Sequence, residues 1–303
     1  MNGHVEIVDL PLNEGVDPDP CRDDESLLLS AVKNGHDAVV KLLLERGSST
    51  DVTTRRPIIP GSIDIATASF HLAATRKGSK PMMEMLLKAG ADIHDRDTKG
   101  NTCLLIAASQ ASAGEVEFLI ANGADVNAQN DTEETCIYKA MGSKVFGYEI
   151  TKTLLENGAR IDARNRHGET CLHFLGHQRG FITLADVWLE LLAIYGADLN
   201  IRDNNGNTPL HHIAGRGEFE TLMSYTNVPG VDINARDCKG WTPLHAAAAS
   251  IWFDGDKKAA ILVEKGADVN YRNNEGRTPL DEAYIINNRE VARYREKNGG
   301  AQR

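Results

Sequence analysis

Several features are missing from the 303-residue chain. It has no run of about 18 apolar residues, which predicts no transmembrane helix, and its first residues lack the basic and apolar segments of a signal peptide. Lys and Arg number 33 against 43 Asp and Glu. This acidic balance argues against nucleic acid or an anionic membrane surface as the partner. Five cysteines are too few for a disulfide scaffold, so we expect a reducing compartment, the cytoplasm, with the nucleus as the alternative.

The chain instead contains a short motif that returns every 33 to 38 residues. Each copy contains a threonine, which is the third residue of the clearest copies: GNTPLHHIA, GWTPLHAAA and GRTPLDEAY. A second segment of the form GADVN lies between successive copies. The threonines are Thr102, Thr135, Thr170, Thr208, Thr242 and Thr278.

These segments resemble the ankyrin repeat, and the resemblance covers nearly the whole chain. It implies an all-α solenoid of stacked helix–turn–helix repeats with β-hairpin-like finger loops. We expect a degenerate half-repeat cap at 1–20, an insertion at 53–62 and one array of eight repeats over 21–303. The predicted repeats are 21–52, 63–96, 97–129, 130–164, 165–202, 203–236, 237–272 and 273–303. The chain opens within a repeat, so it can also be read as a piece of a longer repeat protein.

The residue types in each copy explain why the repeat folds. The threonine is a helix N-cap, and the proline after it suits the first helical position because its missing N–H would have no partner there. The glycine that opens GADVN tolerates the left-handed backbone at a helix end. One unit has too little apolar surface to fold alone, so neighbouring units must stack.

The fourth and fifth repeats depart from this pattern. Glu133 stands where the other finger turns have glycine, so we expect a reshaped finger. Leu175 and Gly176 replace the paired alanines of the fifth inner helix. Functional sites are where such local rules are expected to fail, and the middle repeats are therefore the candidates.

Histidine and cysteine are the residues most easily mistaken for a metal site. The histidine three residues after the threonine is structural in the ankyrin pattern. His4 and His36 stand in turns between helices, and His94 replaces the asparagine of a GADVN segment, which leaves His167, His177 and His212 for other roles. Cysteine replaces the proline in three successive repeats, but equivalent positions should lie roughly 10 Å apart, too far for a disulfide or shared zinc. We therefore predict no metal and no cofactor.

Candidate binding residues gather at the fingers and the concave face. Trp241 replaces polar residues of the sister repeats and is a candidate hot spot. An arginine precedes the residue that opens five of the predicted repeats, at Arg96, Arg164, Arg202, Arg236 and Arg272. This column predicts either a self-paired structural ladder or a groove for acidic groups. The predicted binding set is His167, Glu169, His177, Arg202, Arg236, Lys239, Trp241, Arg272 and Arg277.

Two functions from different classes fit these residues. The first is a non-enzymatic monomeric scaffold that binds a protein or peptide on its concave and finger face. The second is a cofactor-independent enzyme or small-molecule binder, with a polar groove in repeats four to seven that also includes Trp241. Its candidate catalytic residues are Tyr138, Glu169, His177 and Arg202. No Walker loop, nucleophile elbow or zinc-protease motif is present, but acid–base catalysis needs only a few well-placed groups, so catalysis stays open.

Overall fold

The sequence pattern is built into pairs of short antiparallel helices. The structure, a computed structural model, describes residue 9 and residues 27–48, 69–143, 147–177, 185–250 and 254–286. The predicted insertion 53–62 and, apart from Asp9, the predicted cap 1–20 lie outside these ranges. The described residues fall into two compact units, divided between Arg160 and Ile161, and each unit is described by itself. The prediction of one continuous array stays a prediction.

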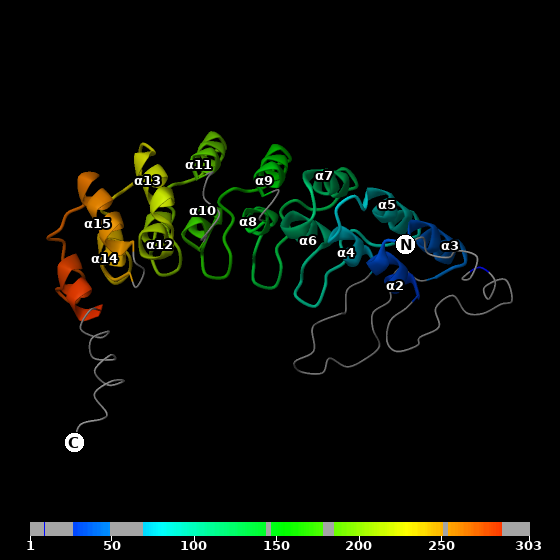
Figure 1. Cartoon of the computed structure of the whole chain (residues 1–303), viewed down its shortest axis with the longest axis horizontal. Helices are drawn as coiled ribbons and strands as arrows, with labels where there is room; N and C mark the ends of the chain where they lie inside the picture. The colour runs from blue at the N-terminus through cyan, green and yellow to red at the C-terminus, as the bar shows by residue number, and fades with distance from the viewer. Residues whose placement is uncertain are drawn as a thin grey trace, which may run out of the picture. The chain divides into compact units, whose positions relative to one another are not determined.

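In the first unit, inner and outer helices alternate along the chain. The inner helices are α2 (Leu27–Asn34), α4 (Ser69–Ala74), α6 (Cys103–Gln110) and α8 (Cys136–Met141). The outer helices are α3 (Asp37–Glu45), α5 (Lys80–Lys88), α7 (Ala113–Ala121) and α9 (Gly147–Glu156). Each inner helix packs on the next inner helix and on its own outer partner, which gives two layers of helices (Figure 1).

The second unit continues the same order. Its inner row holds α10 (Cys171–Phe174) with the 3-10 turn η1 (Leu175–His177), then α12 (Pro209–Arg216) and α14 (Pro243–Ala248). Its outer row holds α11 (Ala185–Ile194), α13 (Phe219–Asn227) and α15 (Gly255–Glu264). Residues 279–286 form a further inner helix. Within the described ranges every regular element is helical, as predicted, with one isolated bridge between Gln129 and Thr135.

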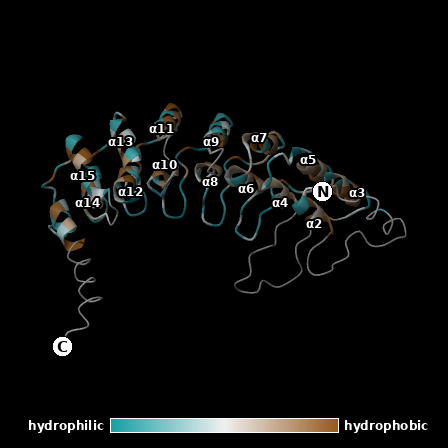
Figure 2. Ribbon diagram, in the orientation of Figure 1, coloured by the Kyte–Doolittle hydropathy of each residue, from teal (hydrophilic) through white to brown (hydrophobic). Residues whose placement is uncertain are grey.

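Burial follows the helical pattern. The inner helix α6 is buried along six of its eight residues, because it is covered by neighbouring inner helices and by its outer partner. Hydrophobic residues gather in the helices, and the loops that join successive repeats are mostly hydrophilic (Figure 2). Apolar surface is thus buried both within a repeat and between repeats, so each repeat depends on its neighbours for part of its stability.

A histidine brace links successive repeats of the second unit. His173 Nδ1 accepts a hydrogen bond from the Thr170 backbone N–H at 3.1 Å, and its Nε2 lies 3.1 Å from the Asn207 carbonyl oxygen of the next repeat. His211 repeats this arrangement with the Trp241 carbonyl, and His245 with the Arg277 carbonyl. The structural role expected for these histidines is therefore present in the structure.

The fourth finger keeps the conformation of the others despite its missing glycine. Glu133 has φ 59°, close to the 76° of Gly168 at the equivalent turn. Its backbone N–H donates to the Asn130 carbonyl, as Gly168 donates to Asn165. The expectation of a reshaped finger was wrong, because the turn hydrogen bonds hold a non-glycine residue in the left-handed region at a cost of about 1–2 kcal/mol.

Candidate binding groove and histidine cluster

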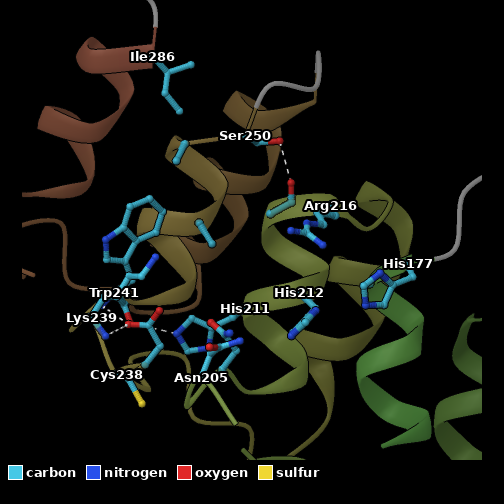
Figure 3. A pocket seen from close by; sticks show the side chains of 16 residues that line it. His177, Asn205, His211, His212, Arg216, Cys238, Lys239, Trp241, Ser250 and Ile286 are labelled. Carbon is cyan, nitrogen blue, oxygen red and sulfur yellow. Dashed lines mark hydrogen bonds between the residues drawn. The ribbon is translucent and has the colours of Figure 1, made fainter. Parts of the chain in front are cut away.

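A half-open groove of about 760 Å³ lies in the second unit, between the ends of α10–η1, α12, α14 and the helical segment 279–286. Trp241 and Lys239 come from the finger before α14, and Arg216 from the end of α12. Figure 3 shows the Trp241 indole at one end of the groove and His212 next to His177 at the other. The shape lies between the closed pocket expected of an enzyme and the open face expected of a scaffold.

Trp241 is held by its backbone, and its side chain is partly exposed. Its N–H donates to Asp237 Oδ1 at 2.7 Å, and its carbonyl oxygen accepts from the Asp237 N–H at 2.9 Å. The indole lies 6.1 Å from the His245 ring, between centroids. Because the finger is fixed through main-chain atoms, its fold does not require an indole at this position.

The groove carries more positive than negative charge. Lys239 and Arg216 line it and are exposed. Asp237 also lines it, but its Oδ1 already accepts hydrogen bonds from the backbone N–H groups of Lys239 and Trp241. A ligand in the groove therefore meets two cations and a carboxylate that is already partly satisfied.

The recurring arginines connect neighbouring fingers. Arg96 donates to the Gln129 carbonyl at 2.8 Å, and Arg202 donates to the Arg236 carbonyl at 2.6 Å. The Arg164 guanidinium donates to the carbonyl of Arg202. These contacts go to main-chain oxygens of the next repeat, so the column acts as a structural ladder through backbone carbonyls. Arg202, Arg236 and Arg272 are not among the residues that line the groove.

An acid–histidine pair lies at the η1 end of the groove. Glu169 Oε1 is 3.4 Å from His177 Nε2, and Glu169 Oε2 accepts from Asn165 Nδ2 at 3.0 Å. The hydrogen bond from His177 lowers the pKa of Glu169 to about 2, against the opposing effect of burial. The Glu169 side chain is 14% exposed. An ionised carboxylate is thus held in a partly buried position beside an imidazole.

A second acid–histidine pair lies on the next repeat. His212 Nε2 is 2.9 Å from Asp203 Oδ2, and the Asp203 side chain is only 2% exposed. Burial raises the pKa of Asp203, but hydrogen bonds from His212, Asn207 and Asn205 outweigh it and hold the pKa well below its usual range. The His177 and His212 ring centroids are 5.2 Å apart. The two pairs therefore form one cluster.

Gly176 allows this close approach. A Cβ built on Gly176 would lie 2.5 Å from the carbonyl carbon and the Cβ of His212, which is shorter than real Cβ contacts. The usual alanine would therefore push α12 away from η1. The departure from the repeat pattern at this position has a physical reason, because it lets His212 sit beside His177.

The remaining predicted residues lie elsewhere. Tyr138 belongs to α8 in the first unit, whereas the other predicted catalytic residues, Glu169, His177 and Arg202, belong to the second. His167 is exposed on its finger, and Arg277 Nε pairs with Glu282 Oε1 at 2.8 Å. Among the predicted residues, the structure brings Glu169 to His177 and places His177, Lys239 and Trp241 along one groove.

The cysteine column, formed by Cys103, Cys136 and Cys171, is buried. Burial raises the pKa of Cys136 and of Cys171 to about 12, and raises the pKa of Cys103 above the usual range. All three are free thiols. Asp203, Asn165 and Gly176 were not predicted to belong to a cluster, although Gly176 was noted as a departure from the repeat pattern.

Comparisons with known proteins agree with the helical architecture. A family model described as ankyrin repeats in three copies matches residues 70–165, 183–273 and 223–294, and a model of the single ankyrin repeat matches residues 23–55. The ankyrin repeat and KH domain-containing protein mask-1 of Caenorhabditis elegans is 31% identical over 118 residues, which is 36% of this chain. The chain spans only 4% of that relative's length.

A solved structure supports the fold. The crystal structure of the ankyrin repeat domain of Bcl-3, described as a unique member of the IkappaB protein family, matches with a TM-score of 0.60 and 22% identity. The match covers 80% of this chain and 100% of that chain. Across the described ranges, no helix combines the length and apolar character that a membrane span needs.

Proposed function

The chain belongs to the ankyrin-repeat family, and we propose that it is a protein-interaction scaffold that seats an acidic peptide segment of its partner in the groove of residues 161–286. The observation that carries this proposal is the partly exposed Trp241 at one end of a half-open groove of about 760 Å³. The main-chain hydrogen bonds of Trp241 hold the finger, so the partly exposed indole is not needed for the finger's fold and can contact a ligand. Tryptophan is enriched among the residues that dominate binding energy at protein interfaces.

Charge sets the chemistry of the ligand. Lys239 and Arg216 are exposed on the groove, so a peptide with Asp or Glu near an apolar residue would meet both the cations and the indole. Arginine binds carboxylates in a bidentate geometry that lysine does not provide. Because the two cations are exposed, their attraction should weaken as salt is added.

The test uses peptides selected from a display library on the purified protein. The selected peptides should be acidic, and Trp241→Ala should weaken their binding about thirtyfold, because losing such an anchor costs about 2 kcal/mol. The matched control is Tyr195→Ala, which removes another partly exposed aromatic residue, 37% exposed, at the end of the outer helix α11. It should leave the affinity unchanged.

The melting temperature separates binding from folding. Trp241→Ala should barely change it, because the finger is fixed through the main chain of Trp241. Peptides that bind Trp241→Ala as tightly as the unchanged protein would refute this groove as the binding face. Unfolding of Trp241→Ala would assign the indole to the core instead.

A further inference from the structure

We propose that Glu169, His177 and His212 form a zinc site at the edge of the groove. A ligand atom from each of the three lies within 4.8 Å of the others. Two histidines and one carboxylate form a common zinc ligand set. The proposal departs from the sequence expectation of no metal, which rested on the spacing of the cysteine column. The three proposed ligands come from two successive repeats. Their separation along the sequence therefore gave no sign that they would meet.

One of the three ligand separations already suits a tetrahedral ion. Zinc bonds to nitrogen and oxygen are about 2.0–2.2 Å long, so two ligand atoms on a tetrahedron are roughly 3.3–3.5 Å apart. Glu169 Oε1 and His177 Nε2 are 3.4 Å apart. Bringing His212 to the same separation from both, from at most 4.8 Å, needs a small movement of side chains, and the His177 side chain is 30% exposed and ends the short turn η1.

The surrounding hydrogen bonds hold two of the ligands. Asn165 occupies Glu169 Oε2 and leaves Oε1 toward His177. The Asp203 carboxylate pairs with His212 Nε2, and in the neutral ring a hydrogen bond donated from Nε2 leaves Nδ1 unprotonated as a ligand. A carboxylate that orients a metal-binding imidazole is the usual outer partner of such histidines. Asp203 is itself fixed by the backbone N–H groups of Asn205 and Asn207.

The nearest other histidine is excluded as a ligand. His173 lies edge-on to His212 with ring centroids 5.2 Å apart, but both of its nitrogens are engaged, one by Thr170 and the other by the Asn207 carbonyl. Among the residues that the structure describes, the set therefore has three protein ligands. Three ligands leave one position of a tetrahedral zinc ion open, as in catalytic rather than structural sites. Since His177 and His212 line the groove, that position is open to solvent or to a ligand in the groove.

The test is zinc titration of untagged, chelator-treated protein by calorimetry, with Co²⁺ absorption as a second probe of coordination. We expect one Zn²⁺ per chain and the spectrum of tetrahedral cobalt. His177→Asn should weaken zinc binding more than about 100-fold, because even the loss of an outer partner costs 10–100-fold. The matched control, His94→Asn, removes an exposed histidine that belongs to no candidate site and should change nothing.

Two further variants keep the test decisive. Glu169→Gln removes a ligand charge with little change of shape, and circular dichroism checks that each variant is folded. Asp203→Asn should lower the affinity about 10–100-fold at unchanged stoichiometry, as expected for an orienting residue. Equal zinc affinity in the unchanged protein, His177→Asn and Glu169→Gln would overturn the site, as would absence of saturable binding. The titration contains no peptide, so its result is independent of the proposed scaffold function.

Discussion

Mild acid should destabilise the second unit through its buried histidine braces, most clearly at His173. This side chain is fully buried. Its Nδ1 accepts from the Thr170 N–H, and its Nε2 donates to the Asn207 carbonyl. A second proton would have to be placed on Nδ1, where it would break the first bond and leave a charge in a buried position. Burial is the main reason that the pKa of His173 is lowered to about 4 from the ordinary 6.5.

The sign and size of the effect follow from linkage. Between pH 6.5 and 4 the unfolded chain binds more protons at His173 than the folded chain does, so the free energy of unfolding falls as the pH falls. The contribution is fully present above pH 6.5 and is lost as the pH drops toward the folded pKa of about 4. The loss of stability, relative to neutral pH, amounts to about 2 kcal/mol at pH 5 and about 3 kcal/mol below pH 4. Burial lowers the pKa of His211 and of His245 too, so their contributions have the same sign.

Denaturant unfolding at pH 7 and pH 5 measures this loss. His173→Gln removes the titration but keeps the side-chain type that a capping box uses at this position, so its stability should fall less between the two pH values, by about 2 kcal/mol. Comparing the two proteins cancels the contribution of the other titrating groups. Lys257→Gln, an exposed change on α15, should keep the full loss. Equal losses for the unchanged protein and His173→Gln would refute the reasoning.

Three other changes have definite expected outcomes. Glu133→Gly should raise the free energy of unfolding by about 0.5–1 kcal/mol, because it relieves a left-handed φ of 59° at some cost in chain entropy; a loss of stability in denaturant unfolding would contradict this. In a Cys21→Ser background a thiol reagent should modify the exposed Cys238 quickly, while the three buried cysteines react only on unfolding; rapid loss of more than one thiol would contradict this. Gly176→Ala should lower the melting temperature, because its Cβ would lie 2.5 Å from His212 atoms; an unchanged melting temperature would show that α12 can move.

The fold could be predicted from the sequence because the repeat encodes it locally. Thr135 caps its helix by accepting from the Tyr138 N–H, and the glycine of each GADVN-like segment takes the left-handed conformation that ends a helix. The fourth finger was misjudged because a steric preference of a kcal/mol or two was weighed without the turn hydrogen bonds that oppose it. Local sequence rules therefore predict where helices and turns form, but they predict less well whether an unusual residue changes the conformation of a turn.

The cluster was harder to predict because it depends on the approach of two repeats. Glu169 and His177 were named together as candidates, and the structure brings them to 3.4 Å. His212 was set aside from the structural histidines but was placed in neither candidate set, since its position in the repeat gives no sign of what faces it. Asp203 was not among the predicted site residues. Its Oδ2 binds His212 within the same repeat, and the close approach of η1 to α12 that Gly176 allows brings this pair to Glu169 and His177.

The aspartate at the base of the finger stabilises only the finger in one repeat, and in another it also binds a histidine. Asp97 uses its carboxylate only to hold the finger, accepting from the backbone N–H groups of Lys99 and Asn101 and from the Asn101 amide. Asp203 makes the equivalent bonds and also holds His212, because the inner helix presents an imidazole where α6 has Ile106. The carboxylate is already fixed by the finger, so orienting the imidazole requires no additional ordered loop. A single inward substitution on a repeat can thus give a turn-stabilising acid an imidazole partner.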